Sequence, residues 1–295
     1  MSFNELMELA KICVDYKDQL GFGSMEYPVY YDSDSNMIIT QIEQAGLKYS
    51  YLKDGKPVLG LDKEADPENA AKEGKELEDK VKKILEDYQS WHNAKYLTTK
   101  QTEGTYASDS FKNKKCFFTI GSSGGAGYSF PQAGEFDMGY CRVPYFGDNS
   151  QENYNKATFI SQGPSIAFCN DKSLSAEANK ERLIYGWKFY KYITSTEINV
   201  ELCVNGSEGY VPVRHSSYAS EDWAEFLGSD TYYAGCARVL QNDINGKFLT
   251  SLVFNGSAEY RNQMTGLVGG VMKGEDSIDD LIATAVNNTK NAMTL

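Results

Sequence analysis

Hydrophobic side chains recur three and four positions apart in several stretches of the chain, which is the spacing that places them on one face of a helix. The first stretch follows Ser2, and Glu5 stands three residues after that serine, as in a capping box. The second ends at Gly46, a residue type that favours the left-handed backbone after a helix. The same spacing predicts helices over residues 3–17, 35–45, 67–91, 175–194, 196–205, 257–273 and 277–291.

Shorter apolar segments alternate with these helices and predict strands. The stretch YLKDGKPVLGL predicts a β-hairpin that turns at Asp54 and Gly55. CFFTI, which begins at Cys116, predicts a compact buried strand, and residues 137–146 and 155–170 predict further strands. SEGYVPVRHSS is expected to be extended, because its proline does not continue a helix. Strands and helices alternate through the first two-thirds of the chain and helices dominate its end, so the predicted fold class is α/β.

Composition narrows the classes of function. The 41 acidic residues outnumber the 29 basic ones and give a net charge of −12, whereas a nucleic-acid backbone attracts a positive surface. We therefore expect no nucleic-acid partner. Six cysteines without C-x-x-C spacing and only two histidines argue against a metal site, and no cofactor is expected. Because most cysteines lie in apolar segments (CFFTI, IAFCN, VELCVNG), they are expected to be buried free thiols.

The beginning of the chain does not resemble a secretion signal. MSFNELMELAK lacks a basic start and an uninterrupted apolar core. Nowhere do 18 apolar residues follow one another, so no segment is expected to span a membrane. Taken on its own, the sequence predicts that the chain stays in the cytoplasm.

The loop GSSGG at residues 121–125 permits several interpretations. It fits G-x-S-x-G, the turn that presents the nucleophile of a serine hydrolase, and His215 follows Ser123 in the order that α/β-hydrolases use. Against this, Pro131 stands where a sustained helix is needed, and no HGGG-like oxyanion segment occurs. The loop has no lysine and is not a Walker A loop. It remains a candidate anion or ligand cradle, or a turn.

Four segments, taken in order, resemble the type-1 extracellular solute-binding proteins of ABC importers. SFNELMELAK is similar to a T-W-x-E-L helix start, and DSFKNKKCFFTIGSSGGAG to a helix–strand–loop that ends in S-x-G. ERLIYGWKFYKYITSTEINVELCVNGSEGYVPVR resembles a block that ends in G-Y-x-P-V-R. GSAEYRNQMTGLVGGVMKGEDSIDDLIATA resembles the closing helices of the family. The nearest relatives by these motifs are maltodextrin- and glycerol-3-phosphate-binding proteins.

The resemblance implies a fold of the periplasmic-binding-protein-like type II, in which two α/β lobes flank a cleft. Residues 1–160 and 212–295 would form the C-terminal lobe, and residues 161–211 would belong to an N-terminal lobe that is otherwise missing. The apolar side chains of that segment would then lack their normal sheet, so we expect them to be exposed, repacked or covered by a partner chain. Those side chains are Ile166, Phe168, Trp187, Phe189, Tyr192 and Ile193.

The resemblance also implies a setting and partners. The full-length parent would be an extracellular, membrane-anchored lipoprotein or a periplasmic protein. It would bind a sugar or a glycerophosphate ester in the interlobe cleft and deliver it to an ABC permease, without covalent chemistry. A separate chain that supplies the N-terminal lobe is a further expected partner. The alternatives are a hydrolase that uses Ser123 and His215, and a remnant that serves as an interaction module.

Residue by residue, the resemblance to glycerol-3-phosphate binders assigns ligand contacts to Ser122, Gly163, Tyr210 and Arg261, and Ser123 is included with the loop. A serine and free backbone N–H groups suit an anion or a sugar hydroxyl, and an arginine pairs two oxygens at once. Related proteins place sugar contacts where this chain has Glu26, Tyr27, Asp34 and Asn36. The loop lacks the tryptophan pair of maltodextrin binders, which favours a smaller sugar or a glycerophosphate ester.

Overall fold

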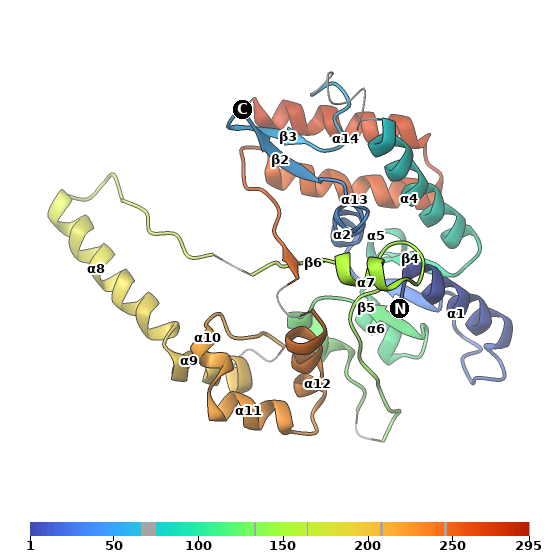
Figure 1. Cartoon of the computed structure of the whole chain (residues 1–295), viewed down its shortest axis with the longest axis horizontal. Coiled ribbons are helices and arrows are strands. Elements are labelled where there is room, and N and C mark those ends of the chain that lie inside the picture. Colours follow the sequence, from blue (N-terminus) through green and yellow to red (C-terminus); the bar gives the residue numbers. More distant parts are fainter. Residues whose placement is uncertain (66–74, 133, 164, 207–208, 245–246, 295) are drawn as a thin grey trace. The chain divides into compact units, whose positions relative to one another are not determined.

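The structure, a computed structural model, describes residues 1–65, 75–132, 134–163, 165–206, 209–244 and 247–294 (Figure 1). The chain divides into two compact units. The larger unit consists of Met1–Ser122, Val143–Ser161 and Gly246–Leu295. The smaller unit consists of Ser123–Arg142 and Gln162–Asn245. Each unit is described by itself.

A three-stranded parallel sheet lies at the centre of the larger unit. Strand β1 (Val29–Tyr31) pairs with β4 (Leu97–Thr99) on one side and with β5 (Phe118–Ile120) on the other. The predicted strand at CFFTI is therefore confirmed, but the sequence pattern did not reveal β1 or β4. Each of these strands has only three residues, all of them buried, so neither shows the alternation that identifies a half-exposed strand.

Helices cover this sheet and bury the main hydrophobic core. The predicted capping box is confirmed, because Ser2 Oγ accepts from the N–H of Glu5 at 3.2 Å and Glu5 Oε2 accepts from the N–H of Ser2 at 2.8 Å. The predicted helix from residue 67 is described only from Lys75, and its first part lies outside the described residues. The helices are α1 (Phe3–Tyr16), α2 (Asp34–Gln44), α4 (Lys75–Asn93), α5 (Lys100–Glu103), α6 (Ala107–Lys112), α7 (Gln151–Lys156), α13 (Ser257–Lys273) and α14 (Ile278–Met293).

Two pairs of short strands complete the larger unit. Strands β2 (Ser50–Lys53) and β3 (Lys56–Leu59) form the predicted hairpin. Asp54 and Gly55 at its turn have φ angles of 50° and 76°, the left-handed values that a type I′ turn requires. Strands β6 (Phe159–Ile160) and β7 (Phe248–Leu249) pair in parallel.

The prediction of strands over residues 137–146 and 155–170 is largely wrong. Of residues 137–146, only Tyr145 forms a bridge, to Ser2, and Pro144 beside it has no N–H with which to extend a ladder. Among the described residues of the second stretch, only Phe159 and Ile160 form a strand, and the first two residues of that stretch end helix α7.

Helices dominate the smaller unit, which has a small core of its own. Val200, Cys203, Trp223 and Ala237 are buried together, and the indole N–H of Trp223 donates to Gln241 Oε1 at 2.9 Å. The helices are α8 (Ala176–Ile193), α9 (Thr196–Glu201), α10 (His215–Tyr218), α11 (Glu221–Gly228) and α12 (Tyr232–Arg238). A 3₁₀ segment, η2 (Ser123–Ser129), and two π turns, η3 (Leu202–Gly206) and η4 (Val239–Ile244), accompany them.

The two compact units follow a different division from the predicted lobes. The smaller unit joins residues 162–211, which were assigned to the N-terminal lobe with residue 161, to residues 123–142 and 212–245, which were assigned to the C-terminal lobe. The N–H of Val213 donates to Asn199 Oδ1 at 2.9 Å, and Ser217 Oγ donates to the carbonyl of Thr196 at 3.4 Å. Which lobe of a full-length protein each unit represents stays a prediction.

All six cysteines are free thiols, but not all are buried as expected. Cys13, Cys116 and Cys203 are buried, whereas Cys141 and Cys169 are exposed. Cys169 is exposed because the apolar segment IAFCN is not a buried strand. Burial raises the pKa of Cys116 to about 12, so this thiol stays protonated at neutral pH.

No described helix is long and apolar enough to cross a bilayer. Over the same residues, His, Cys, Asp and Glu side chains nowhere gather in threes as potential metal ligands.

Candidate functional site

The carboxyl edge of the parallel sheet brings two loops of the larger unit together. Asp32 follows β1, and Gly121 and Ser122 follow β5. The N–H of Asp32 donates to the carbonyl of Ile120 at 2.8 Å, and a Cβ placed on Gly121 would lie 3.6 Å from that of Asp32. Ser122 is exposed beside them. In open α/β sheets ligands bind outside this edge, so the position suits the predicted role of Ser122.

Asn36 and Arg261 meet near this edge, where the first turn of α2 lies beside the beginning of α13. The guanidinium of Arg261 donates to Asn36 Oδ1. Arg261 is half-buried, and this burial lowers its pKa from the ordinary value. Among the residues that the structure describes, no carboxylate forms an ion pair with it. Besides the amide of Asn36, the side chain of Tyr49 interacts favourably with the guanidinium, so neutral groups offset its partial desolvation and charged donors are left for oxygen atoms of a ligand.

Asp34 is close in sequence to this pair, but it is buried. Its side chain is 2% exposed, and its Oδ2 accepts from the N–H of Gln101 at 3.2 Å. Burial raises the pKa of Asp34, and its Oδ1 has no partner. The carboxyl group therefore fastens the beginning of α5 to α2, and a solute cannot reach it without displacing these helices.

Glu26 and Tyr27 lie at the opposite, amino edge of the sheet, just before β1. Tyr27 is buried, and its ring stacks on His92 with 5.0 Å between centroids. The ammonium of Lys95 lies 2.6 Å from the hydroxyl of Tyr27. The structure thus does not bring Glu26 and Tyr27 together with Asn36 and Arg261.

In the smaller unit, the glycine-rich loop and the predicted G-Y-x-P tyrosine are in contact. A Cβ on Gly124 would lie 2.8–3.0 Å from atoms of the Tyr210 ring, so the ring packs directly on the backbone of Gly124. Gly209 has a φ of 92°, and a Cβ there would lie 2.0 Å from the carbonyl oxygen of Ser123. Tyr210 itself is 51% exposed. Because Gly124 and Gly209 have no side chains, the loop and residue 210 pack closely, and the half-exposed ring of Tyr210 lies beside Ser123.

Further tyrosines lie close to this loop, and the sequence motifs did not indicate them. The hydroxyl of Tyr233 would lie 2.1 Å from a Cβ on Gly127, and its ring packs edge-on against Phe130 at 4.5 Å. Tyr140 packs on Gly235 in the same way, and its hydroxyl accepts from Arg238 at 3.1 Å. The only sign of them in the sequence is the high tyrosine content, 21 residues, which often marks sugar-binding clefts or interfaces.

Gly163, also in the smaller unit, is exposed and open. A Cβ there would meet no atom within 4 Å, so the backbone is accessible, but no neighbouring group singles it out. Its predicted ligand contact stays a prediction.

The hydrolase interpretation finds no support in the geometry. Ser123 begins a 3₁₀ segment of seven residues instead of the sustained helix behind a nucleophile elbow. His215 is exposed at the start of α10, and no hydrogen bond among the described residues joins its ring to Ser123 or to a carboxylate. The orienting contacts that activate a serine are therefore not assembled here.

Comparison with known proteins agrees with these features. A model of the bacterial extracellular solute-binding protein family matches residues 1–226. Among solved structures, maltose-bound MalE3 of T. maritima has a similar fold, with a TM-score of 0.61 at 13% sequence identity. The similarity covers 98% of this chain but only 64% of the length of that one. No curated protein sequence matches the chain.

Proposed function

This chain belongs to the bacterial extracellular solute-binding protein family, and we propose that it forms much of the solute receptor of an ABC importer. Its solute is a carbohydrate or a glycerol-phosphate-type ester. The receptor works outside the cytoplasm, and its partner is the membrane-embedded ABC permease. The family match and the similarity of fold to a maltose-bound protein support this proposal.

The observation that carries the proposal is the half-buried Arg261. A protein that is poor in basic residues keeps this guanidinium partly desolvated at the carboxyl edge of a parallel sheet, without a carboxylate among its described partners. A half-buried cation that has no acid among its described partners is stabilised when a ligand supplies oxygen atoms. Phosphate or sugar hydroxyl oxygens fit this requirement, and Ser122 offers a hydroxyl at the same edge.

Tyr210 and the loop around Gly124 supply a second surface, on the smaller unit. A flat, exposed aromatic face beside a serine hydroxyl suits the apolar side and the hydroxyl groups of a sugar ring. We assign Ser122, Asn36 and Arg261 to oxygen recognition, and Ser123 and Tyr210 to ring recognition. Asp34 and Tyr27 are left out because they are buried, and Glu26 because it lies at the other edge of the sheet.

Electrostatics distinguishes the two solute classes. The net charge of −12 repels an anionic solute at long range, so a phosphate ester binds only if local donors outweigh that field. A hydrogen bond to a charged group contributes about 1.5–3 kcal/mol, which is roughly one to two decades in affinity. If the solute is a phosphate ester, Arg261 is the principal source of that contribution.

Calorimetric titration tests this proposal. Maltose and glycerol 3-phosphate are titrated separately into the chain. We expect Arg261→Ala to weaken glycerol 3-phosphate about tenfold or more, and maltose much less. Lys273→Ala, which removes the same charge from the far end of α13, is the matched control and should change neither affinity. Binding of neither solute class to any preparation would contradict the proposed function.

A further inference from the structure

The hydroxyl group of Tyr49 is buried and has no hydrogen-bond partner among the residues that the structure describes. Tyr49 stands just before strand β2 and is only 4% exposed. A phenylalanine would bury the same ring without the cost of leaving a hydroxyl group unpaired. Packing alone therefore does not account for a tyrosine at this position, and an unpaired buried polar group requires an explanation of its own.

Contacts from three parts of the larger unit hold the Tyr49 ring in one orientation. The ring stacks on Tyr260 of α13, with 4.5 Å between centroids and 9° between the ring planes. The N–H of Tyr49 donates to Glu43 Oε1 of α2 at 2.8 Å. Its carbonyl accepts from the N–H of Gly60, beside the β2–β3 hairpin, also at 2.8 Å. The phenol oxygen therefore has a fixed position, which is set by α2, α13 and the hairpin together.

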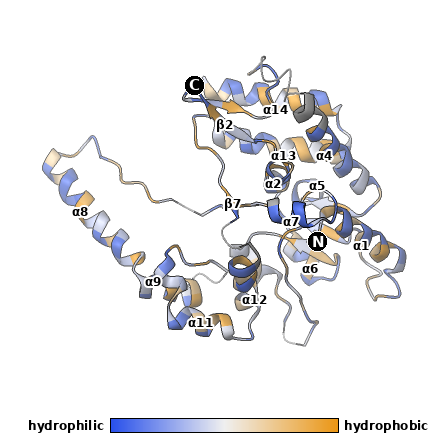
Figure 2. Cartoon of the chain, in the orientation of Figure 1, coloured by the Kyte–Doolittle hydropathy of each residue, from blue (hydrophilic) through white to orange (hydrophobic). Residues whose placement is uncertain are grey.

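The phenol oxygen of Tyr49 interacts with the guanidinium of Arg261, the residue that follows Tyr260 in α13. Figure 2 shows that hydrophobic and hydrophilic residues both occur along this helix. Burial raises the pKa of Tyr49, and the cation of Arg261 opposes that rise. Burial lowers the pKa of Arg261, and Tyr49 opposes that fall. The two side chains therefore interact favourably, although Tyr49 stays protonated and uncharged at neutral pH.

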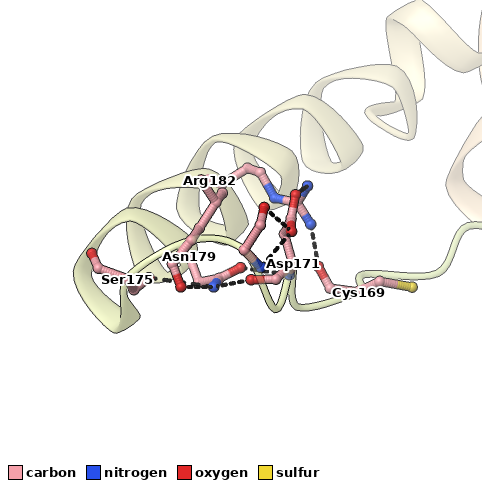
Figure 3. Close-up of polar contacts among 7 residues, drawn as sticks. Cys169, Asp171, Ser175, Asn179 and Arg182 are labelled. Carbon is pink, nitrogen blue, oxygen red and sulfur yellow. Dashed lines mark hydrogen bonds and ion pairs between the residues drawn. The ribbon is translucent and has the colours of Figure 1, made fainter.

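Arg182, in the smaller unit, shows a different way of holding an arginine. Its guanidinium donates to the carbonyl of Cys169 and lies 3.9 Å from the carboxylate of Asp171 (Figure 3). Asn179 in turn accepts from the N–H of Asp171 and donates to its carbonyl, both at 2.7 Å. A carboxylate neutralises the charge of an arginine, whereas the neutral partners of Arg261 leave its charge for a ligand.

Building on the proposed function, we infer that Tyr49 is a positioning residue of the solute site: its hydroxyl group orients the guanidinium of Arg261 toward oxygen atoms of the solute. Tyr49 does not touch the solute, because its hydroxyl oxygen is buried. A guanidinium is planar, so groups that fix its plane also fix the direction of all its N–H donors. Asn36 fixes it by a hydrogen bond and Tyr49 by electrostatic attraction. Because both partners are neutral, the full positive charge remains for the solute, which favours a phosphate ester over an uncharged sugar.

Tyr49→Phe tests this role, because it removes the hydroxyl group and keeps the ring that stacks on Tyr260. Glycerol 3-phosphate and maltose are titrated by calorimetry into the parent chain and into the variant. We expect Tyr49→Phe to weaken glycerol 3-phosphate about three- to tenfold and maltose less, which is the range for one lost hydrogen-bonding group. The same substitution in an Arg261→Ala background should cause no further loss, since its effect passes through the guanidinium.

Stability measurements separate this role from a purely structural one. Tyr49→Phe leaves no hydroxyl group unpaired at this position, so the free energy of unfolding should stay the same or rise. Tyr88→Phe is the matched control, because Tyr88 is also buried and its hydroxyl group also lacks a partner among the described residues. It should leave both affinities unchanged.

Nuclear magnetic resonance gives a readout that needs no solute. The chain has only five arginines, so the side-chain Nε–H signal of Arg261 can be assigned by its loss in Arg261→Lys. That signal should shift in Tyr49→Phe and stay in place in Tyr88→Phe, because Tyr49 is the tyrosine that acts on the guanidinium.

Three results would each overturn the inference. These are parent-like affinity of Tyr49→Phe for a solute that the parent chain binds, an equal loss of affinity with and without Arg261, or an unchanged Arg261 signal. Failure of the proposed function is a different result. If the parent chain binds neither glycerol 3-phosphate nor maltose, the function is refuted, and the Arg261 signal alone decides whether Tyr49 orients the guanidinium.

Discussion

Helices α13 and α8 have nearly the same length and opposite surroundings. Of the 17 residues of α13, eight are buried, and Tyr260 among them stacks on Tyr49 with 4.5 Å between centroids. Of the 18 residues of α8, none is buried. Both helices were predicted from the same apolar spacing. Apolar spacing therefore predicts that a helix forms, whereas its burial depends on which other segments are present to cover it.

The largest expected difference between the two helices is the cost of truncating an apolar side chain. Met264 is fully buried in α13, so Met264→Ala should lower the free energy of unfolding by about 2–5 kcal/mol. Phe189→Ala on α8 should change it by less than about 0.5 kcal/mol, because that ring is already exposed to water. Urea titration followed by circular dichroism measures both. Equal costs would mean that α8 is buried in solution.

Within the smaller unit, a second comparison sets Gly209 against Gly163. Gly209→Ala forces a positive φ on alanine and drives its Cβ into the carbonyl of Ser123, so it should destabilise the loop contact by about 1–3 kcal/mol. Gly163→Ala meets no atom within 4 Å and should be nearly neutral. If Tyr210 takes part in solute binding, Gly209→Ala should also weaken solute binding, because it displaces the loop contact that positions the Tyr210 ring. Thermal unfolding of the two variants measures the difference in stability, and calorimetric titration measures the difference in solute affinity.

The smallest effect is expected in the core of the larger unit, at Asp34. Burial raises its pKa in the folded state, so its contribution to stability is complete in acid, below the unfolded pKa of about 3.9, and is lost as the pH rises through the folded value. Asn does not ionise and can still accept from the N–H of Gln101. The Asp34→Asn variant should therefore become more stable relative to the parent chain as the pH rises from 3 to 7. Urea titrations of both proteins at several pH values across that range measure this difference. A parallel pH dependence of the two proteins would refute this role for Asp34.

Much of the architecture could be predicted from local signals. Capping by Ser2, the turn at Asp54 and Gly55, and the end of α2 at Gly46 depend on neighbouring residues alone, and all three are confirmed. Strands β1 and β4 were missed because three buried residues carry no periodicity. Residues 137–146 were wrongly predicted as a strand because their apolar composition resembles one, although few of their backbone groups find a ladder partner.

The sequence predicted the site residues that lie in motifs with a defined backbone. It did not predict which of the candidate residues are buried, because burial depends on packing between distant segments. The contact between Gly124 and Tyr210 and the pairing of Arg261 with Asn36 join residues that the sequence had already singled out. Asp34 and Tyr27 were singled out too, yet burial removes them from solvent, and nothing in their local sequence reveals that.

Hydrogen exchange of the dilute chain, read at α8 and at α13, tests the central claim most directly. The account predicts that α13 amides exchange only through large-scale unfolding, while α8 amides exchange orders of magnitude faster, since few packing contacts oppose their opening. Amides of α8 that are as protected as those of α13 in the dilute chain would contradict the claim that α8 is an exposed helix with few packing contacts.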